Sequence, residues 1–158
     1  MRVSLDVDGA AAAVAVFSAE VSLQPLGTDA VARYRDRFWT CGDRTLGDED
    51  TIDAAGRTLR FRRPHPWSAA AVVDVVHGRR EPSEPTHLLM AAGPVILGPD
   101  ADSHLQVDAA ETVVLFRTDD GLAWKRFSGP LDAEPVNRLS LPSLVETDTL
   151  RCRVQSLG

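Results

Sequence analysis

The segment 60–67, RFRRPHPW, gathers basic and aromatic side chains in a chain whose formal net charge is −6. Its basic or titratable side chains are Arg60, Arg62, Arg63 and His65. Two guanidinium groups on one face of a strand can hold a carboxylate or phosphate through paired hydrogen bonds. Trp67 can stack on a planar ligand. Alternating arginines are also typical of a solvent-exposed strand face, so the segment predicts either an anion site or an ordinary strand end.

A second candidate is the segment 68–78, SAAAVVDVVHG, in which Asp74 and His77 stand three residues apart. On a helix the two side chains would share a face, and the carboxylate could orient the imidazole as a general base. On a strand they would point to opposite sides. Ser68 and Gly78 suit the ends of a helix, but the valines favour a strand, which is our prediction. The candidate catalytic residues are His65, His77 and Asp74.

Two acidic segments raise the question of a metal. Asp100, Asp102 and His104 are spaced by two, so in an extended segment all three would lie on one side and could bind a divalent cation. They are also ordinary turn residues. The segment 47–53, GDEDTID, lacks the glycine and the final glutamate of a calcium-binding loop. We predict neither a metal nor a cofactor.

Aromatic side chains outside these segments are further candidates for ligand contacts. Phe38 and Trp39 are adjacent, so only one can face the core squarely, and Trp124 lies opposite Ala123 on its strand. We expect at least one tryptophan to be partly exposed at a pocket mouth or a partner surface. The predicted ligand-binding residues are Arg60, Arg62, Arg63, Trp67, Tyr34, Trp39 and Trp124.

Composition limits the class of protein. The 158 residues, 44% of them hydrophobic and 25% charged, predict one globular domain over 1–158, with an exposed loop near 79–87. The net charge and a pI of about 5.1 argue against a nucleic-acid partner. No segment approaches the roughly 20 apolar residues of a membrane span. Cys41 and Cys152 show no disulfide or metal spacing, which favours reduced thiols and a cytoplasmic location.

Alternating apolar residues predict several strands. A first hairpin joins residues 2–7, through Asp8-Gly9, to a second strand that carries Phe17, Ala19, Val21 and Leu23 on one face. Residues 57–63 predict a half-buried strand with Leu59 and Phe61 inward. The clearest hairpin spans 111–127 around Asp119-Asp120-Gly121. A last strand places Leu150, Cys152 and Val154 on one face.

The segment 29–41 predicts a helix. Thr28 suits its N-cap and Gly42 the position after its end. Its apolar residues fall on one helical stripe, namely Val31, Tyr34, Phe38 and Cys41. The whole pattern favours an α+β or mostly β fold: an antiparallel, hairpin-rich sheet or barrel of about seven or eight strands with one or two helices.

Three functions fit these residues. The first is binding of a small, anionic or planar ligand in a cavity. The second is a small cofactor-free enzyme of isomerase, cyclase or lyase type, in which His65 or His77 is the base and Arg60 or Arg62 holds an anion. The third is a protein-interaction module without a pocket, and edge strands also allow a homo-oligomer. A concave Arg60/Arg62 face would favour the first two, and a histidine touching a carboxylate in that cavity would favour the second.

Overall fold

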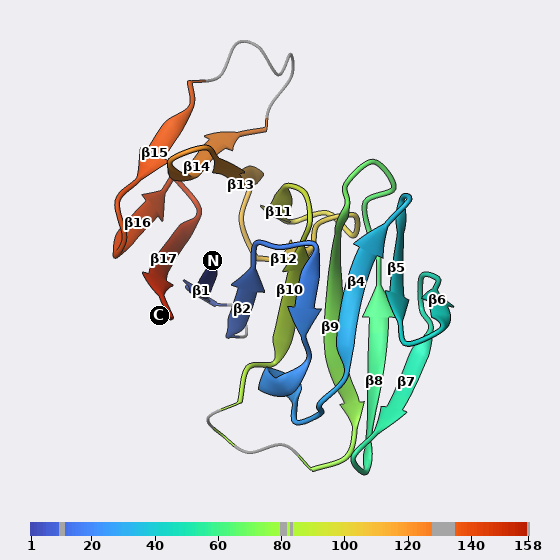
Figure 1. The fold of residues 1–158 in the computed structure, drawn as a ribbon. Helices are drawn as coiled ribbons and strands as arrows, with labels where there is room; N and C mark the ends of the chain where they lie inside the picture. The colour runs from blue at the N-terminus through green and yellow to red at the C-terminus, as the bar shows by residue number, and fades with distance from the viewer. Residues whose placement is uncertain (10–11, 80–81, 83, 128–134, 158) are drawn as a thin grey trace.

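The computed structural model describes residues 1–9, 12–79, 82, 84–127 and 135–157, and it is built from strands (Figure 1). Those residues form three sheets and no α-helix; the short 3-10 turn η1 (Gln24–Leu26) is their single helical element. No helix in the described part of the chain is long and apolar enough to cross a membrane. The mostly β prediction is confirmed, whereas the predicted helices and the closed barrel are wrong.

The largest sheet has eight strands and forms the middle layer. Its strands in spatial order are β16 (Ser143–Glu146), β17 (Arg151–Ser156), β1 (Arg2–Val7), β2 (Ala13–Val16), β10 (His87–Ala91), β9 (Ala70–His77), β8 (Arg57–Arg62) and β7 (Thr51–Ala54). All neighbours are antiparallel except β2 and β10, which run parallel.

Two smaller sheets complete the fold. The five-stranded sheet has the order β12 (Leu105–Gln106), β11 (Val95–Gly98), β13 (Val113–Thr118), β14 (Gly121–Arg126) and β15 (Asn137–Leu139). The four-stranded sheet has the order β3 (Glu20–Ser22), β4 (Val31–Arg35), β5 (Phe38–Cys41) and β6 (Arg44–Leu46). In Figure 1, β4–β6 lie on the right and β13–β15 at the upper left. The described residues thus hold 17 strands, not seven or eight.

The middle sheet is buried on both faces at its central strands β9 and β10. In β9, Ala70 and Val72 belong to a core shared with the five-stranded sheet, whereas Ala71 and Val73 belong to a core shared with the four-stranded sheet. In β10, Leu89 and Leu88 divide in the same way. A strand covered on both sides shows continuous rather than alternating hydrophobicity. This explains why 68–78 resembled a helix, and the predicted strand is confirmed.

The helix predicted over 29–41 is wrong, because this segment folds as the β4–β5 hairpin. Asp36 and Arg37 form its two-residue turn with positive φ angles of 54° and 73°. The turn reverses the alternation, so the even-numbered residues of β4 share a face with the odd-numbered residues of β5. The apolar residues of the predicted helical stripe therefore lie on both faces of the hairpin. The side chains that the hairpin buries completely are Ala32 and Trp39.

The second strand of the predicted first hairpin is also divided. Residues 13–16 form β2 in the eight-stranded sheet, whereas 20–22 form β3 in the four-stranded sheet. Residues 17–19 pass between the two sheets. Within the Asp8-Gly9 connection, residues 10 and 11 lie outside the described residues, as do 80, 81 and 83 of the predicted 79–87 loop.

The remaining strand predictions are confirmed. β8 buries Leu59 and Phe61 and places Arg60 and Arg62 on the other face. The β13–β14 hairpin turns at Asp119-Asp120 and buries Val113, Leu115 and Ala123. β17 buries Cys152 and Val154 directly after the buried Leu150.

We predict that the three layers unfold together. Leu88→Ala and Leu89→Ala remove buried side chains from opposite faces of β10, and each should lower the free energy of unfolding by about 2–5 kcal/mol. Urea unfolding followed by circular dichroism and by tryptophan fluorescence measures both. Leu144→Ala, at an exposed site, is the control. Two separate transitions would show that the two cores are independent.

Candidate functional site

We call a group of charged side chains across β8, β9 and β10 the polar cluster. Its members are Glu49, Arg60, Arg62, Asp74 and His87. The strand register places Arg60 opposite Asp74, and Asp74 opposite His87. Their neighbours Phe61, Val73 and Leu88 point into the core under the four-stranded sheet. Because side chains alternate along a strand, the polar cluster occupies the other face of the middle sheet.

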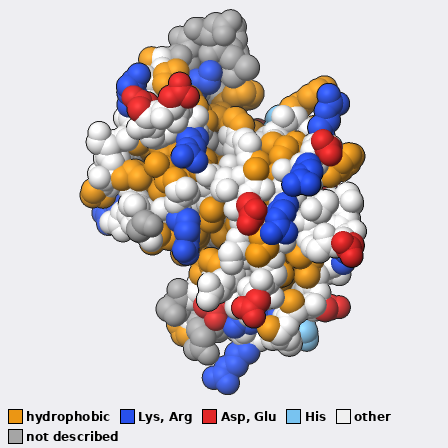
Figure 2. All heavy atoms as spheres, in the orientation of Figure 1, with side chains coloured by type: hydrophobic (Ala, Val, Ile, Leu, Met, Phe, Trp, Pro, Cys, Tyr) orange, Lys and Arg blue, Asp and Glu red, His pale blue; other side chains and the backbone are white. Residues whose placement is uncertain are grey.

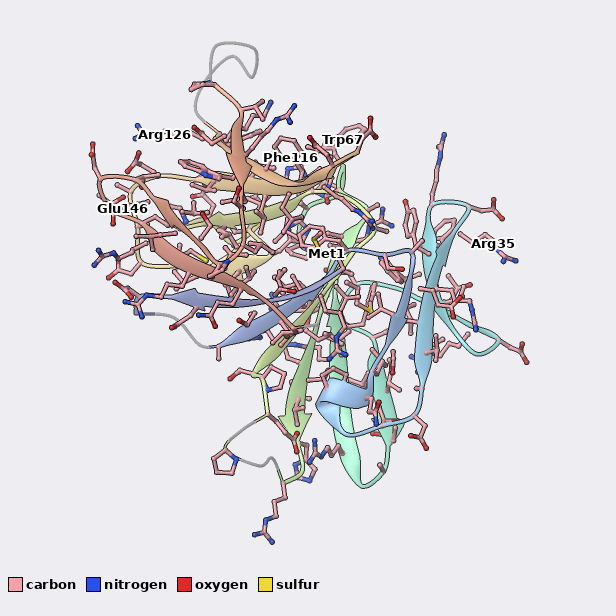
Figure 3. The ribbon with its side chains drawn as sticks, turned by 60° about the vertical axis from the view of Figure 1, so that its left-hand side comes forward. Met1, Arg35, Trp67, Phe116, Arg126 and Glu146 are labelled. Atoms are coloured by element: carbon pink, nitrogen blue, oxygen red, sulfur yellow. The ribbon has the colours of Figure 1, made fainter. Side chains whose placement is uncertain are left out.

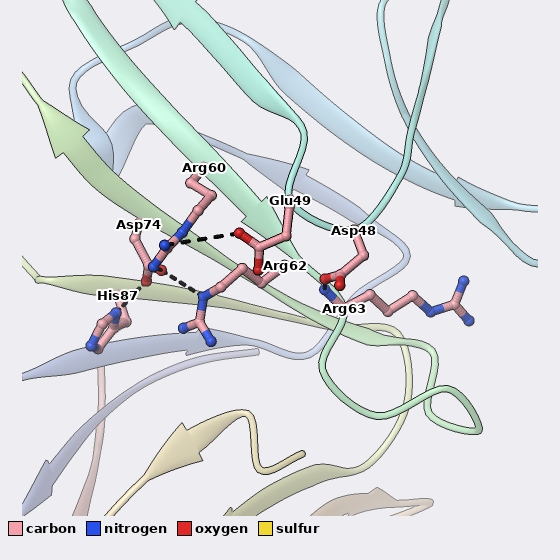
Figure 4. Close-up of polar contacts among 7 residues, drawn as sticks. All are labelled: Asp48, Glu49, Arg60, Arg62, Arg63, Asp74 and His87. Atoms are coloured by element: carbon pink, nitrogen blue, oxygen red, sulfur yellow. Dashed lines mark hydrogen bonds and ion pairs between the residues drawn. The ribbon is translucent and has the colours of Figure 1, made fainter. Parts of the chain in front are cut away.

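Asp74 is the centre of the polar cluster (Figure 4). Its Oδ2 accepts hydrogen bonds from Arg62 Nε at 2.8 Å and Arg60 Nη2 at 3.3 Å. Its Oδ1 contacts Nδ1 of His87. Arg60 also lies 3.9 Å from the carboxylate of Glu49. Only 6% of the Asp74 side chain is exposed, so these contacts replace most of its hydration.

The surroundings of Asp74 keep it ionised. Burial by itself would raise the pKa of this carboxyl group, but the hydrogen bonds from His87 and Arg62 outweigh burial and lower the pKa to about 2. The carboxylate therefore remains charged through the neutral range. It neutralises much of the field of the two arginines, so Arg60 and Arg62 do not form the free pair of cations that the sequence suggested.

The structure does not bring the predicted catalytic residues together. His77 is exposed at the end of β9, three residues from Asp74 along the strand. His65 lies in the loop after β8, where its Nδ1 accepts a hydrogen bond from the backbone N–H of Trp67. The histidine that contacts Asp74 is His87, which sequence reasoning missed. The only local sequence feature that marks His87 is that it is a titratable residue at the start of the apolar run HLLMAA.

Three predicted ligand-binding residues connect structural elements instead. Arg63 donates from Nη1 to the carbonyl of Arg37 at 2.8 Å, and its guanidinium lies 5.6 Å from the centre of the Tyr34 ring. Tyr34 packs against Trp39, which is fully buried and donates from Nε1 to the carbonyl of Ala69 at 2.8 Å. These contacts tie the β4–β5 hairpin to the 63–69 loop, and Trp39 presents no surface to a ligand.

The residues considered for a metal site differ in their exposure to solvent. His104 is buried, accepts the N–H of Ile96 at Nδ1 and places Nε2 3.2 Å from the carbonyl of Ala70. Burial lowers the pKa of His104 to about 4, so the ring is neutral and serves as a structural link between backbone groups. Asp100 and Asp102 are exposed. Within the described part of the chain, no group of three potential ligands can hold a metal ion.

A cleft of about 520 Å³ lies elsewhere, between the β13–β14 hairpin and the links β2–β3 and β10–β11. We call it the hairpin cleft. Its lining is Phe17, Ser18, Ala19, Ala91, Ala92, Gly93, Pro94, Val114, Phe116, Arg117 and Lys125. The walls are mostly apolar, and the charged groups in them are both cations. On the face drawn in Figure 2, basic side chains are interspersed with acidic and hydrophobic ones.

The two cations differ in their hydrogen-bond partners. Arg117 donates from Nη1 to the carbonyl of Phe17 at 3.1 Å, which fixes its guanidinium at the wall of the cleft. Lys125, the single lysine of the chain, is partly buried and has no hydrogen-bond or ion-pair partner among the described residues.

Trp67 stands near the rim of the hairpin cleft. Ser68 donates from Oγ to the carbonyl of Pro94 at 2.7 Å, which attaches the 63–69 loop to a lining residue of the cleft. Trp67 itself is 90% exposed, and Figure 3 shows it at the same end of the molecule as Phe116. Trp124, in contrast, packs against the core on the inner side of the hairpin.

Comparison of the chain with known protein families, with curated proteins and with solved structures gave no match. The polar cluster and the hairpin cleft are the two candidate sites in the described part of the chain. The polar cluster holds a histidine against a carboxylate, and the hairpin cleft offers volume, apolar walls and a lysine that has no partner among the residues that the structure describes.

We predict that Asp74 contributes stability that depends on pH. Because its pKa falls from 3.8 to about 2 on folding, this contribution is present above pH 3.8 and is lost as the pH falls through about 2. Asp74→Asn should lower the free energy of unfolding by about 2 kcal/mol at pH 7. Urea unfolding of both proteins from pH 7 to pH 2 measures the difference. A difference that persists unchanged at pH 2 would contradict this assignment.

Proposed function

We propose that this chain binds a small ligand with a planar or apolar body and an anionic group in the hairpin cleft. The observation that carries the proposal is the combination of a cavity of about 520 Å³ with an unpartnered Lys125 among the described residues. Small-molecule sites are commonly concave and apolar, with few polar groups to orient the ligand. Lys125 and Arg117 supply those groups, and their charge selects an anion.

The walls of the cleft support an apolar or planar ligand body. Phe17, Val114 and Phe116 come from two different segments and present hydrophobic surface to the same space. Burying apolar area of a ligand contributes about 25 cal/mol per Å². Trp67, attached to the rim through Ser68, provides an indole face on which a planar group can stack. Within the segment 60–67, Trp67 is the residue that we still propose to contact the ligand.

The hairpin cleft is a better candidate than the Arg60/Arg62 face for two reasons. Both arginines donate to Asp74, whereas Lys125 has no acceptor in the described part of the chain. The hairpin cleft also has a measurable volume, and none of its lining residues belongs to the segment 60–67. We therefore assign the anionic group of the ligand in the hairpin cleft to Lys125 and Arg117 rather than to Arg60 and Arg62.

Binding of 2-naphthoate tests the proposal, with neutral 2-naphthamide as the matched control compound. We expect naphthoate to bind more tightly, because only the carboxylate can form a charge-assisted hydrogen bond with Lys125. Lys125→Gln should weaken naphthoate binding about tenfold and leave naphthamide binding unchanged. Two-dimensional NMR titration measures the affinities and locates the affected residues.

Arg126→Gln is the control variant, because Arg126 is the next residue on β14 and forms an ion pair with Glu111 outside the cleft. It should bind both compounds as the wild type does. Equal affinities for the two compounds, or chemical-shift changes confined to residues outside the cleft, would refute the proposal.

A second candidate function, docking to a protein, is favoured by the exposure of Trp67. An indole that is 90% exposed gains much from burial, and tryptophan is enriched among residues that dominate protein interfaces. If a second copy of the chain covers this side chain, sedimentation velocity should show an oligomer that dissociates on dilution. Trp67→Ser should then sediment as a monomer at every concentration. Wild-type protein that stays monomeric at high concentration would exclude self-association through Trp67.

A further inference from the structure

The polar cluster leaves donor groups unused. Arg62 contacts Asp74 through Nε alone, and its terminal Nη1 and Nη2 have no hydrogen-bond partner among the described residues. Nε2 of His87 likewise has none within that part of the chain. An arginine can donate five hydrogen bonds and a protonated imidazole two. The cluster therefore holds more N–H donors than its own carboxylates use.

The two side chains that carry these unused donors meet at Asp74. Arg62 Nε and His87 Nδ1 contact the two oxygens of one carboxylate, so Asp74 fixes the two side chains next to each other. Figure 4 shows the guanidinium of Arg62 and the ring of His87 on either side of the Asp74 carboxylate. The Arg62 side chain is 22% exposed and that of His87 is 23% exposed. Solvent reaches both groups, while the buried carboxylate behind them holds their orientation.

The net charge of the polar cluster depends on whether His87 is protonated. Asp74 and Glu49 carry two negative charges, and Arg60 and Arg62 carry two positive charges. The cluster is neutral with a neutral imidazole and has a charge of +1 with a protonated one. On the adjoining connection, Glu84 is engaged by Arg57, and the β2 residue opposite His87 is Ala13. Protonation of His87 therefore creates an unbalanced positive charge next to the free Nη groups.

We propose that Arg62 and His87 form a site for a small oxyanion, a carboxylate or a tetrahedral phosphate-type group, and that binding is coupled to protonation of His87. The terminal N–H groups of Arg62 match two oxygens of such an anion, and the imidazolium donates from Nε2 to a third or shared oxygen. Asp74 is the positioning residue, because it holds both donors and does not touch the anion. This site is separate from the hairpin cleft and does not depend on it.

Sulfate and acetate, titrated separately at pH 5.5 and pH 8, test the proposal. The two pH values lie on either side of the range in which imidazole groups ordinarily change charge, whereas Asp74 stays ionised at both. We expect shift changes at the His87 ring and at the Arg62 guanidinium in NMR spectra, with affinity about tenfold higher at pH 5.5. Tighter binding of sulfate would identify a tetrahedral ligand, and tighter binding of acetate a carboxylate.

Sodium chloride at equal ionic strength controls for screening, and the exposed His77 is an internal reference ring. His87→Gln should remove the pH dependence, and Arg62→Gln should weaken binding at both pH values. Arg35→Gln, at an exposed position on β4, should bind sulfate as the wild type does. Shifts that chloride reproduces, or an affinity that is equal at the two pH values in the wild type, would overturn the proposal.

Discussion

Burial of both faces of β9 and β10 is the constraint on which the rest of the structure depends. Each of these strands supplies side chains to two cores, one under the five-stranded sheet and one under the four-stranded sheet. A sheet with apolar residues on both faces is stable in water only when both are covered. The two smaller sheets are therefore necessary partners of the middle sheet, and their positions follow from its composition.

The same constraint explains the form of the polar cluster. Asp74 interrupts an otherwise apolar strand at a place where it is almost completely buried, and an unpaired carboxylate there would cost several kcal/mol. Arg60, Arg62 and His87 compensate it from the two neighbouring strands. Stability thus requires a fixed arrangement of donors around one carboxylate, and such an arrangement is also what recognition of an anion requires.

Local patterns predicted local structure well. The alternation in β8 and the hairpin of β13 and β14 are properties of neighbouring residues, and both were confirmed. The helix prediction for residues 29–41 was wrong, because a two-residue turn there joins two short strands and reverses the alternation of their side chains. The contact between Asp74 and His87 joins residues on adjacent strands through a register that no local spacing reveals. The hairpin cleft was missed for the same reason, because its walls come from three distant segments.

The pairing of β1 with β17 has a consequence for synthesis of the chain. β1 hydrogen-bonds with β2 on one side, while its other edge is covered by a strand that lies some 145 residues further along. A ribosome adds residues one by one, so this edge stays open until residues 151–156 have been made. Open strand edges invite pairing with other chains. The nascent protein therefore passes through a long aggregation-prone interval, in which chaperones that shield strand edges would raise its yield.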